Sequence, residues 1–239
     1  MIARVATTVT GNRAAWTGKY SIFDYLSIVS ICFLMINYGI DSLISALEAR
    51  PHEATVTNPY RLPNRSDNLR HYLRALLDQP GRRILVVGEA LGYRGGLLTG
   101  IPLSSERLVR EQAHPFWRRL APDLTIDGRM AEATASIVWH YLAERRRIPL
   151  FWNAFPFHPH RSGEPHSNRP PTAADIAEGI PYLQAVVSLY RPVIIGGLGT
   201  KGTLAAQRAL PGQAVRALRH PSYGGKPAFV EGMHRLLGS

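Results

Sequence analysis

Cysteine and acidic residues are scarce in this sequence, and each shortage excludes a class of protein. Cys32 is the sole cysteine among 239 residues, so the chain cannot form an internal disulfide, a four-cysteine zinc site or an iron–sulfur cluster. The 17 acidic residues are outnumbered by 28 Lys and Arg, which leaves a formal charge of +11. Such a basic chain favours a polyanionic partner, either nucleic acid or an anionic membrane surface.

Long hydrophobic runs are also missing. The longest apolar stretch, residues 26–36 (LSIVSICFLMI), is shorter than the roughly 20 apolar residues of a transmembrane helix, and no small-x-small cleavage site follows it. We interpret residues 1–40 as a non-essential N-terminal extension, with translation starting upstream of Met35. Two alternatives stay open for this segment, a weak interfacial membrane anchor and a genuine packed helix.

Residues 41–239 alternate helical and strand patterns. Short apolar runs, typical of strands buried on both faces of a parallel sheet, are expected at 84–87, 148–152, 193–195 and 214–218. Helices are expected at 66–78, 105–120, 128–147, 172–190, 201–210 and 227–237. This order predicts one α/β domain, a three-layer α/β/α sandwich around a central, mainly parallel four-stranded sheet.

Local signals support two of the expected helices. Ser66 is a candidate N-cap, and Thr172 with Asp175 has the pattern of a capping box. Gly179 and Pro181 lie inside the second of these helices. We expect them to kink or split it.

Ligands of parallel α/β sheets bind beyond the carboxyl ends of the strands. The loops there read GEALGYRGG (88–96), NAFPFHPH (153–160) and HPSYGGK (220–226). Neither the first of these loops nor the glycine-rich segment 196–202 has the spacing of a dinucleotide fingerprint or a P-loop.

A metal site is not expected either. His158, His160 and His166 lie in a proline-rich loop in which no cysteine or carboxylate stands at ligand spacing. We therefore expect the protein to need neither a metal nor another cofactor, and we interpret the three histidines as loop residues.

Taken together, the three loops resemble the uracil-DNA glycosylase superfamily. The segment 88–92 (GEALG), followed by 99–102 (TGIP), is similar to the first motif of branches that read G-E-A-P-G and T-G-x-P-F. The segment 220–222 (HPS) is similar to the second motif, and Asn153 takes the position of the base-reading asparagine. The resemblance covers roughly residues 82–226. It implies an enzyme that flips a deaminated base, uracil foremost, out of DNA and hydrolyses its N-glycosidic bond.

The resemblance implies four catalytic residues, Glu89, His220, Asn153 and Glu106. An imidazole at His220 would stabilise negative charge on the departing base. The amide of Asn153 offers one donor and one acceptor, which match the edge of uracil. A carboxylate would orient water and stabilise the cationic sugar. Glu89 and Glu106 are both candidates for that role, with a slight preference for Glu89.

The resemblance also implies a base pocket and a DNA-facing surface. The expected pocket residues are Ala90, Gly92, Tyr93, Leu103, Phe155 and Phe157. Leu103 stands where the family has a phenylalanine that stacks on the base, so Phe155 or Phe157 could substitute. The expected DNA contacts are Arg94, Arg169, Lys201, Arg219, Ser222, Tyr223 as a duplex wedge and Lys226 as a phosphate contact. Gly92 replaces a selective tyrosine, so mismatched thymine, hypoxanthine and xanthine stay open as substrates.

These observations predict a monomeric, monofunctional DNA glycosylase of base excision repair, cytoplasmic and associated with the nucleoid through DNA, with no membrane partner. No lyase step is expected, because the sequence places no lysine or proline as a Schiff-base nucleophile. Two other classes stay open. One is a DNA- or RNA-binding protein that keeps the pocket without turnover, and the other is an enzyme that processes nucleotides or nucleosides.

Overall fold

The computed structural model of the protein describes residues 22–238, and the first part of the predicted extension, residues 1–21, lies outside them. Residue contacts divide the chain into two units with a boundary between Ile36 and Asn37, a few residues before the boundary expected from the sequence. Helix α1 (Ile22–Ala49) continues through this boundary. No helix among the described residues combines the length and apolar character that crossing a membrane requires.

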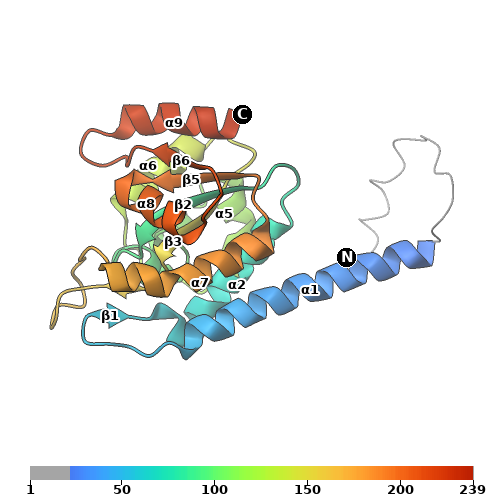
Figure 1. Cartoon of the computed structure of the whole chain (residues 1–239), viewed down its shortest axis with the longest axis horizontal. Helices are drawn as coiled ribbons and strands as arrows, with labels where there is room; N and C mark the ends of the chain where they lie inside the picture. Colours follow the sequence, from blue (N-terminus) through green and yellow to red (C-terminus); the bar gives the residue numbers. More distant parts are fainter. Residues whose placement is uncertain (1–21, 239) are drawn as a thin grey trace. The chain divides into compact units, whose positions relative to one another are not determined.

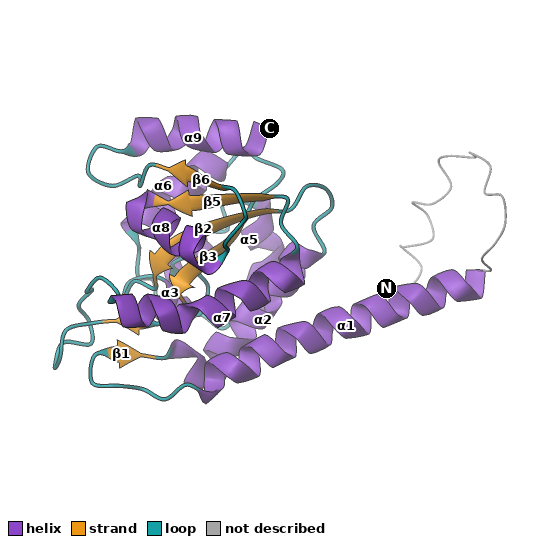
Figure 2. Cartoon of the chain, in the orientation of Figure 1, coloured by secondary structure: helices purple, strands orange, loops and turns teal. Residues whose placement is uncertain are grey.

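A four-stranded sheet forms the centre of the second unit (Figures 1 and 2). Its strands are β2 (Ile84–Ala90), β3 (Leu150–Phe155), β5 (Ile194–Leu198) and β6 (Val215–Leu218). The spatial order is β3-β2-β5-β6, and every neighbouring pair is parallel. The predicted four-stranded parallel sheet is confirmed. All four carboxyl ends therefore lie along one edge of the sheet.

Helices cover both faces of this sheet, as the sandwich prediction requires (Figure 2). Helices α7 (Ala173–Tyr190) and α8 (Gly199–Ala209) pack on one face. Helices α2 (Pro63–Leu77), α5 (Pro115–Leu120) and α6 (Ala133–Leu142) lie at the other. There the Trp139 ring of α6 packs against Phe151 of β3, the Tyr72 hydroxyl of α2 accepts a hydrogen bond from the Phe151 amide, and Phe116 of α5 packs against both the Tyr72 and the Trp139 rings. The remaining elements are α3 (Gly96–Thr99), α4 (Glu106–Glu111), α9 (Lys226–Gly238), the 3-10 turns Pro59–Arg61 and Ala121–Asp123, and a small antiparallel pair, β1 (Val56–Thr57) with β4 (His158–Pro159).

The second half of α1 belongs to the core of the second unit. Ile40, Ile44 and Leu47 are completely buried. Asp41 accepts a hydrogen bond from Arg70 of α2 at 3.0 Å. Burial of these apolar side chains, at about 25 cal/mol per Å² of apolar surface, contributes directly to the stability of this unit.

Two predicted helices differ from expectation: one is divided into two helices and the other is shorter. The helix predicted at 105–120 is two helices, α4 and α5, because Gln112 has a left-handed φ of +50° that ends α4 and Pro115 begins α5. The helix predicted at 128–147 is α6 alone. The preceding residues from 128 onward do not coil because Glu106 binds their backbone amides.

The two predicted helix starts differ in outcome. The capping box of Thr172 and Asp175 is confirmed, and α7 is one continuous helix despite Gly179 and Pro181. Gly179 gives α7 close contact with the sheet, since a Cβ there would lie 1.8 Å from the carbonyl oxygen of Ala154. The Ser66 cap prediction is wrong because α2 already begins at Pro63.

Candidate active site

A cavity of about 450 Å³ lies at the carboxyl edge of the sheet. Its wall includes residues from the ends of β2 and β3, the first turn of α8 and the loop that follows β6. The three predicted groups Glu89, Asn153 and His220 all line it, together with Lys201 and Glu132. The parallel sheet brings together side chains that are up to 131 positions apart in the sequence.

Asn153 lies on β3 directly opposite Gly88 of β2. A Cβ at Gly88 would lie only 2.6 Å from Asn153 Oδ1, so the missing side chain creates the space that the amide occupies. Asn153 is 5% exposed and lines the cavity. Because a buried amide needs hydrogen-bond partners, this one is placed to bind a polar group that enters the cavity.

His220 follows β6, lines the cavity and has one ring nitrogen already engaged by the backbone. The backbone N–H of Ser222 lies 3.3 Å from His220 Nδ1 and donates to it, so the neutral ring carries its proton on Nε2. Burial lowers the pKa of His220 below its ordinary value of 6.5. Glu132 raises that pKa, Arg219 lowers it and Glu89 raises it, in decreasing order of effect. The neutral ring at pH 7 can therefore donate one hydrogen bond from Nε2.

Glu89 and Lys201 form an ion pair in the wall of the cavity. The Glu89 Oε1 to Lys201 Nζ distance is 3.2 Å, and the two side chains are 33% and 60% exposed. Glu89 lies near the end of β2 and Lys201 in the first turn of α8. A carboxylate and an amine thus lie side by side at the mouth of the same cavity as Asn153 and His220.

Glu106, the other predicted catalytic carboxylate, lies outside the cavity lining. It is 4% exposed, and its two carboxylate oxygens accept hydrogen bonds from the backbone amides of Gly128 at 2.8 Å and Met130 at 2.9 Å. Its oxygens are therefore used to hold the segment before α6. Of the two predicted carboxylates, Glu89 is the one that lines the cavity.

Glu132 lines the cavity although the sequence did not single it out. Glu132 is the N-cap residue of α6, and its carboxylate accepts hydrogen bonds from the backbone amides of Thr134 and Ala135. The expected helix over 128–147 hid this role, because a residue inside a helix cannot cap it. Only a correct helix boundary at residue 133 could have revealed Glu132.

The predicted base-pocket residues separate into three groups. Ala90, Gly92 and Leu103 line the cavity, and Tyr93 lies at a neighbouring depression beside Arg94. Phe155 and Phe157 lie outside the cavity lining, which corrects their predicted role. Both are fully buried in the core, where their rings pack against each other with centroids 5.3 Å apart. Neither ring is placed to stack on a base.

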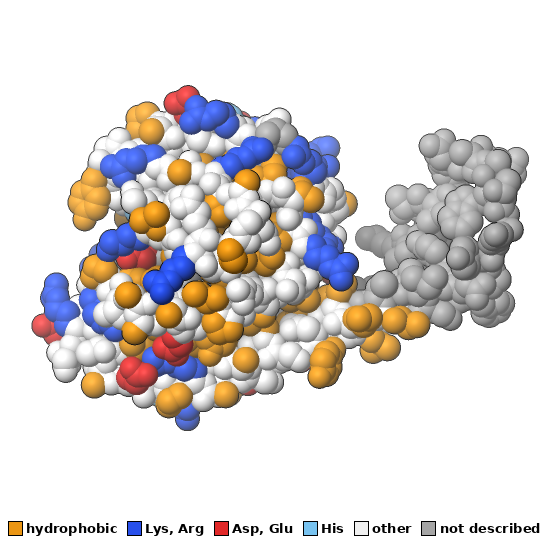
Figure 3. Space-filling model, viewed as in Figure 1, with side chains coloured by type: hydrophobic (Ala, Val, Ile, Leu, Met, Phe, Trp, Pro, Cys, Tyr) orange, Lys and Arg blue, Asp and Glu red, His pale blue; other side chains and the backbone are white. Residues whose placement is uncertain are grey.

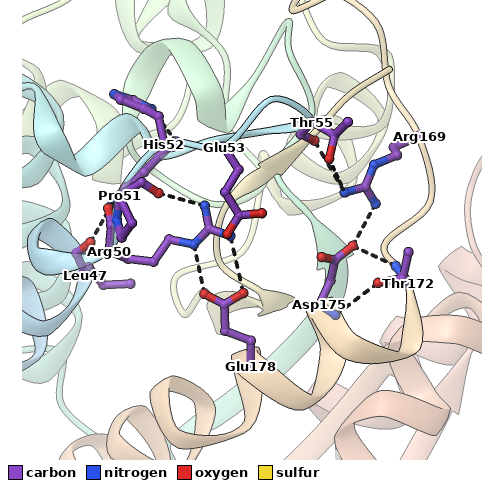
Figure 4. Close-up of polar contacts among 11 residues, drawn as sticks. Leu47, Arg50, Pro51, His52, Glu53, Thr55, Arg169, Thr172, Asp175 and Glu178 are labelled. Atoms are coloured by element: carbon purple, nitrogen blue, oxygen red, sulfur yellow. Dashed lines mark hydrogen bonds and ion pairs between the residues drawn. The ribbon is translucent and has the colours of Figure 1, made fainter. Parts of the chain in front are cut away.

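The segment 168–171 supplies part of the cavity wall, and of its four residues only Arg169 was predicted from the sequence. Arg169 donates to Asp175 at 2.6 Å and lies within 3.3 Å of the Thr55 carbonyl oxygen, so this predicted DNA contact anchors the segment (Figure 4). Although burial raises the pKa of Asp175, hydrogen bonds from Arg169 and Thr172 bring it below its ordinary value. Nearby, Arg50 binds Glu178 and Glu53 in a second ion-pair cluster (Figure 4).

The other predicted DNA contacts are mostly exposed. Tyr223 is 98% exposed and has a left-handed φ of +52° in the turn after His220. Arg94, Arg219 and Lys226 are also exposed. On the face drawn in Figure 3, Lys and Arg side chains outnumber acidic ones. This surface is suited to a polyanion.

Two histidines of the proline-rich loop, His158 and His160, have buried side chains, whereas His166 is exposed. His158 is fully buried, with its two ring nitrogens 2.8 Å from the Leu91 carbonyl oxygen and 3.1 Å from that of Pro165. His160 Nε2 lies 3.1 Å from the Thr57 hydroxyl. Across residues 22–238, no three His, Cys, Asp or Glu side chains are arranged to hold a metal ion.

Comparison with known proteins agrees with this geometry. The crystal structure of SMUG2 from Pedobacter heparinus has a similar fold, with a TM-score of 0.60 and 16% identity over 84% of this chain and 99% of that one. A search of curated protein sequences finds no match. The family model of the uracil DNA glycosylase superfamily matches residues 76–228, which include the cavity residues from β2 to His220. This match covers more than half of the chain, and the motifs lie at the strand ends where the sequence analysis expected them. The chain therefore belongs to the uracil-DNA glycosylase superfamily.

Proposed function

We propose that the protein hydrolyses the N-glycosidic bond of a deaminated base in DNA, uracil foremost, and leaves an abasic site. One observation carries this proposal: the Asn153 amide, the His220 ring and the Glu89 carboxylate converge on one cavity in a chain of this superfamily. The cavity can accept a base only after the base leaves the helical stack. The basic surface around it would hold the DNA backbone.

Each group has a role that follows from its chemistry. The Asn153 amide donates to O4 and accepts from N3–H of uracil, a pairing that cytosine cannot match. His220 donates from Nε2 to a carbonyl oxygen of the departing base, on which negative charge develops. Glu89 orients a water molecule and stabilises the cationic sugar. Water oxygen bonds to C1′ as the C1′–N bond breaks, the bonding electrons leave with the base, and the water proton passes to Glu89.

The open position at Gly92 bears on substrate choice. A Cβ at Gly92 would meet its nearest neighbour, Asn168 Oδ1, only at 3.9 Å, so nothing on this side fills the cavity. Uracil is therefore the first substrate to test, followed by mismatched thymine, hypoxanthine and xanthine. We further propose that the protein acts as a monomer at the nucleoid in the cytoplasm. We also propose that it acts without a metal ion, because no step above calls for a metal ion.

The test is base release from duplex oligonucleotides with one lesion each, detected by cleavage of the abasic strand in alkali. Asn153→Ala and His220→Ala should each lower the rate about a hundredfold or more, as loss of a preorganised donor does. His140→Ala is the matched control, because His140 is exposed at the end of α6 and outside the cavity lining.

Two results would count against the enzyme. If the folded protein binds these duplexes in a salt-dependent way but releases no base, it is a nucleic-acid-binding module. If it instead releases the base from free nucleosides or nucleotides and not from DNA, it belongs to the class that processes small molecules.

A further inference from the structure

Lysine is rare in this basic protein. Three of its 28 basic residues are lysines, Lys19, Lys201 and Lys226, and all others are arginines. Arginine is the better residue for binding phosphate and carboxylate groups, whereas a primary amine can form a Schiff base with an aldehyde. Lys201 lines the catalytic cavity, whereas Lys226 is exposed and lines a separate depression. Of the two lysines among the described residues, Lys201 is thus the one whose amine lies where the substrate would react.

The backbone that carries this amine is firmly held. Lys201 lies in the first turn of α8, two residues before Thr203, whose hydroxyl donates to the carbonyl oxygens of Gly197 at 2.9 Å and Gly199 at 2.8 Å. The Lys201 side chain is 60% exposed, so it keeps the freedom to turn towards a bound sugar. Its Nζ lies 3.2 Å from Oε1 of Glu89, the carboxylate that we propose to act at C1′ of the sugar.

We propose that Lys201 is the nucleophile of a second activity, an abasic-site lyase that cuts the DNA strand after the base has left. The proposal goes beyond base hydrolysis and revises the expectation of a monofunctional enzyme. It rests on the proposed function only in assuming that the abasic sugar occupies the same cavity. The sequence could not show it, because Lys201 and Glu89 are 112 positions apart.

The reaction needs no group beyond these two residues. Lys201 passes a proton to Glu89, and its free amine attacks C1′ of the ring-opened aldehyde to form a carbinolamine. Glu89 returns the proton to the hydroxyl, which leaves as water and gives the protonated Schiff base. The Glu89 carboxylate then removes a C2′ proton. The electrons of that C–H bond form the C2′=C3′ double bond as the C3′–O bond breaks and the 3′ phosphate leaves. Hydrolysis of the Schiff base frees Lys201.

The test uses the full chain and a duplex in which a natural abasic site is prepared beforehand, so base release is not required. Sodium borohydride reduces a Schiff base to a stable secondary amine. We expect one covalent protein–DNA adduct, which peptide mass analysis maps to Lys201. Lys201→Arg keeps a cation beside Glu89 but lacks a primary amine, so adduct and alkali-independent strand cleavage should fall about a hundredfold.

The matched control is Lys19→Arg, which makes the same exchange at a lysine to which no role in the site is assigned, and the adduct should persist. If Lys201→Arg shows no cooperative melting transition and is therefore unfolded, Lys201→Ala serves as a second variant. An adduct of equal yield in both Lys201 variants, or no adduct with wild-type protein bound to the abasic duplex, overturns the proposal. Base release from a uracil duplex is measured in parallel, so failure of the lyase and failure of the glycosylase are told apart.

Discussion

At the scale of single residues, the position of the Asn153 amide, the proposed base-reading group, depends on a side chain that is missing. Gly88 leaves the space in which Asn153 Oδ1 lies, 2.6 Å from where a Cβ would be. In Gly88→Ala the new methyl group must displace the amide, which is the end of a flexible side chain. We expect base release to fall by about tenfold or more while the fold persists, because small misplacements at a reacting site are costly. Oligonucleotide kinetics together with the melting temperature check this.

Gly92→Ala is the comparison for that variant. It adds the same methyl group to the same cavity wall, but the nearest atom lies 3.9 Å away, in ordinary contact distance. Its melting temperature should match that of the wild type. If Gly88→Ala released uracil at the wild-type rate, the proposed role of Asn153 in reading the base would be wrong.

The protonation state of His220 gives a second prediction at this scale. Burial lowers its pKa below 6.5, so the neutral ring predominates at pH 6.5 and its share increases at higher pH. If the neutral ring donates from Nε2, the rate of base release should not fall between pH 6.5 and 8.5. Single-turnover rates across this range test the prediction. A rate that drops about tenfold per pH unit would show instead that the imidazolium is the active form.

At the scale of elements, Glu106 joins α4 to the segment that leads into α6. Its carboxylate accepts two hydrogen bonds, from the backbone amides of Gly128 and Met130. In Glu106→Gln an NH₂ group replaces one of the two acceptor oxygens and faces one of these backbone N–H groups. We expect a loss of about 1–3 kcal/mol in the free energy of unfolding, since a buried N–H group is left unsatisfied. Urea denaturation measures this loss.

Glu89→Gln distinguishes the two carboxylates. Glu89 is 33% exposed at the cavity mouth, so its loss should lower base release with little change in stability. The reverse pattern, in which Glu106→Gln removes base release at unchanged stability, would move the catalytic role to Glu106.

At the scale of the whole molecule, buried histidines make stability depend on pH. Burial is the largest cause that lowers the pKa values of His114, His158 and His220 below 6.5. Below pH 6.5 the unfolded chain binds protons that the folded chain does not bind. The free energy of unfolding must therefore fall as the pH falls through this value.

The slope can reach about 1.4 kcal/mol per pH unit for each histidine. Urea denaturation at pH 7.5, 6.5 and 5.5 checks this prediction. Stability that stays constant or rises between pH 7.5 and 5.5 would contradict it, because it would require these rings to be protonated in the folded state.

The sequence by itself determined the fold class and the edge of the sheet at which the candidate site lies. Apolar runs such as 84–87 are local signals of buried strands, and strand ends of a parallel sheet meet at one edge, so Glu89, Asn153 and His220 could be placed together without coordinates. Helix boundaries at Gln112 and residue 133 could not be placed. They depend on a left-handed backbone and on the contacts of Glu106 with a segment more than 20 residues away.

Only the tertiary structure decided which side chains face the cavity. It turned Glu106 towards the backbone, buried Phe155 and Phe157 in the core, and brought Glu132 and Lys201 to the wall. Residue type and order along the chain carry no information on where a side chain points once distant elements pack. Packing sets those directions, and with them which carboxylate and which amine can reach a substrate.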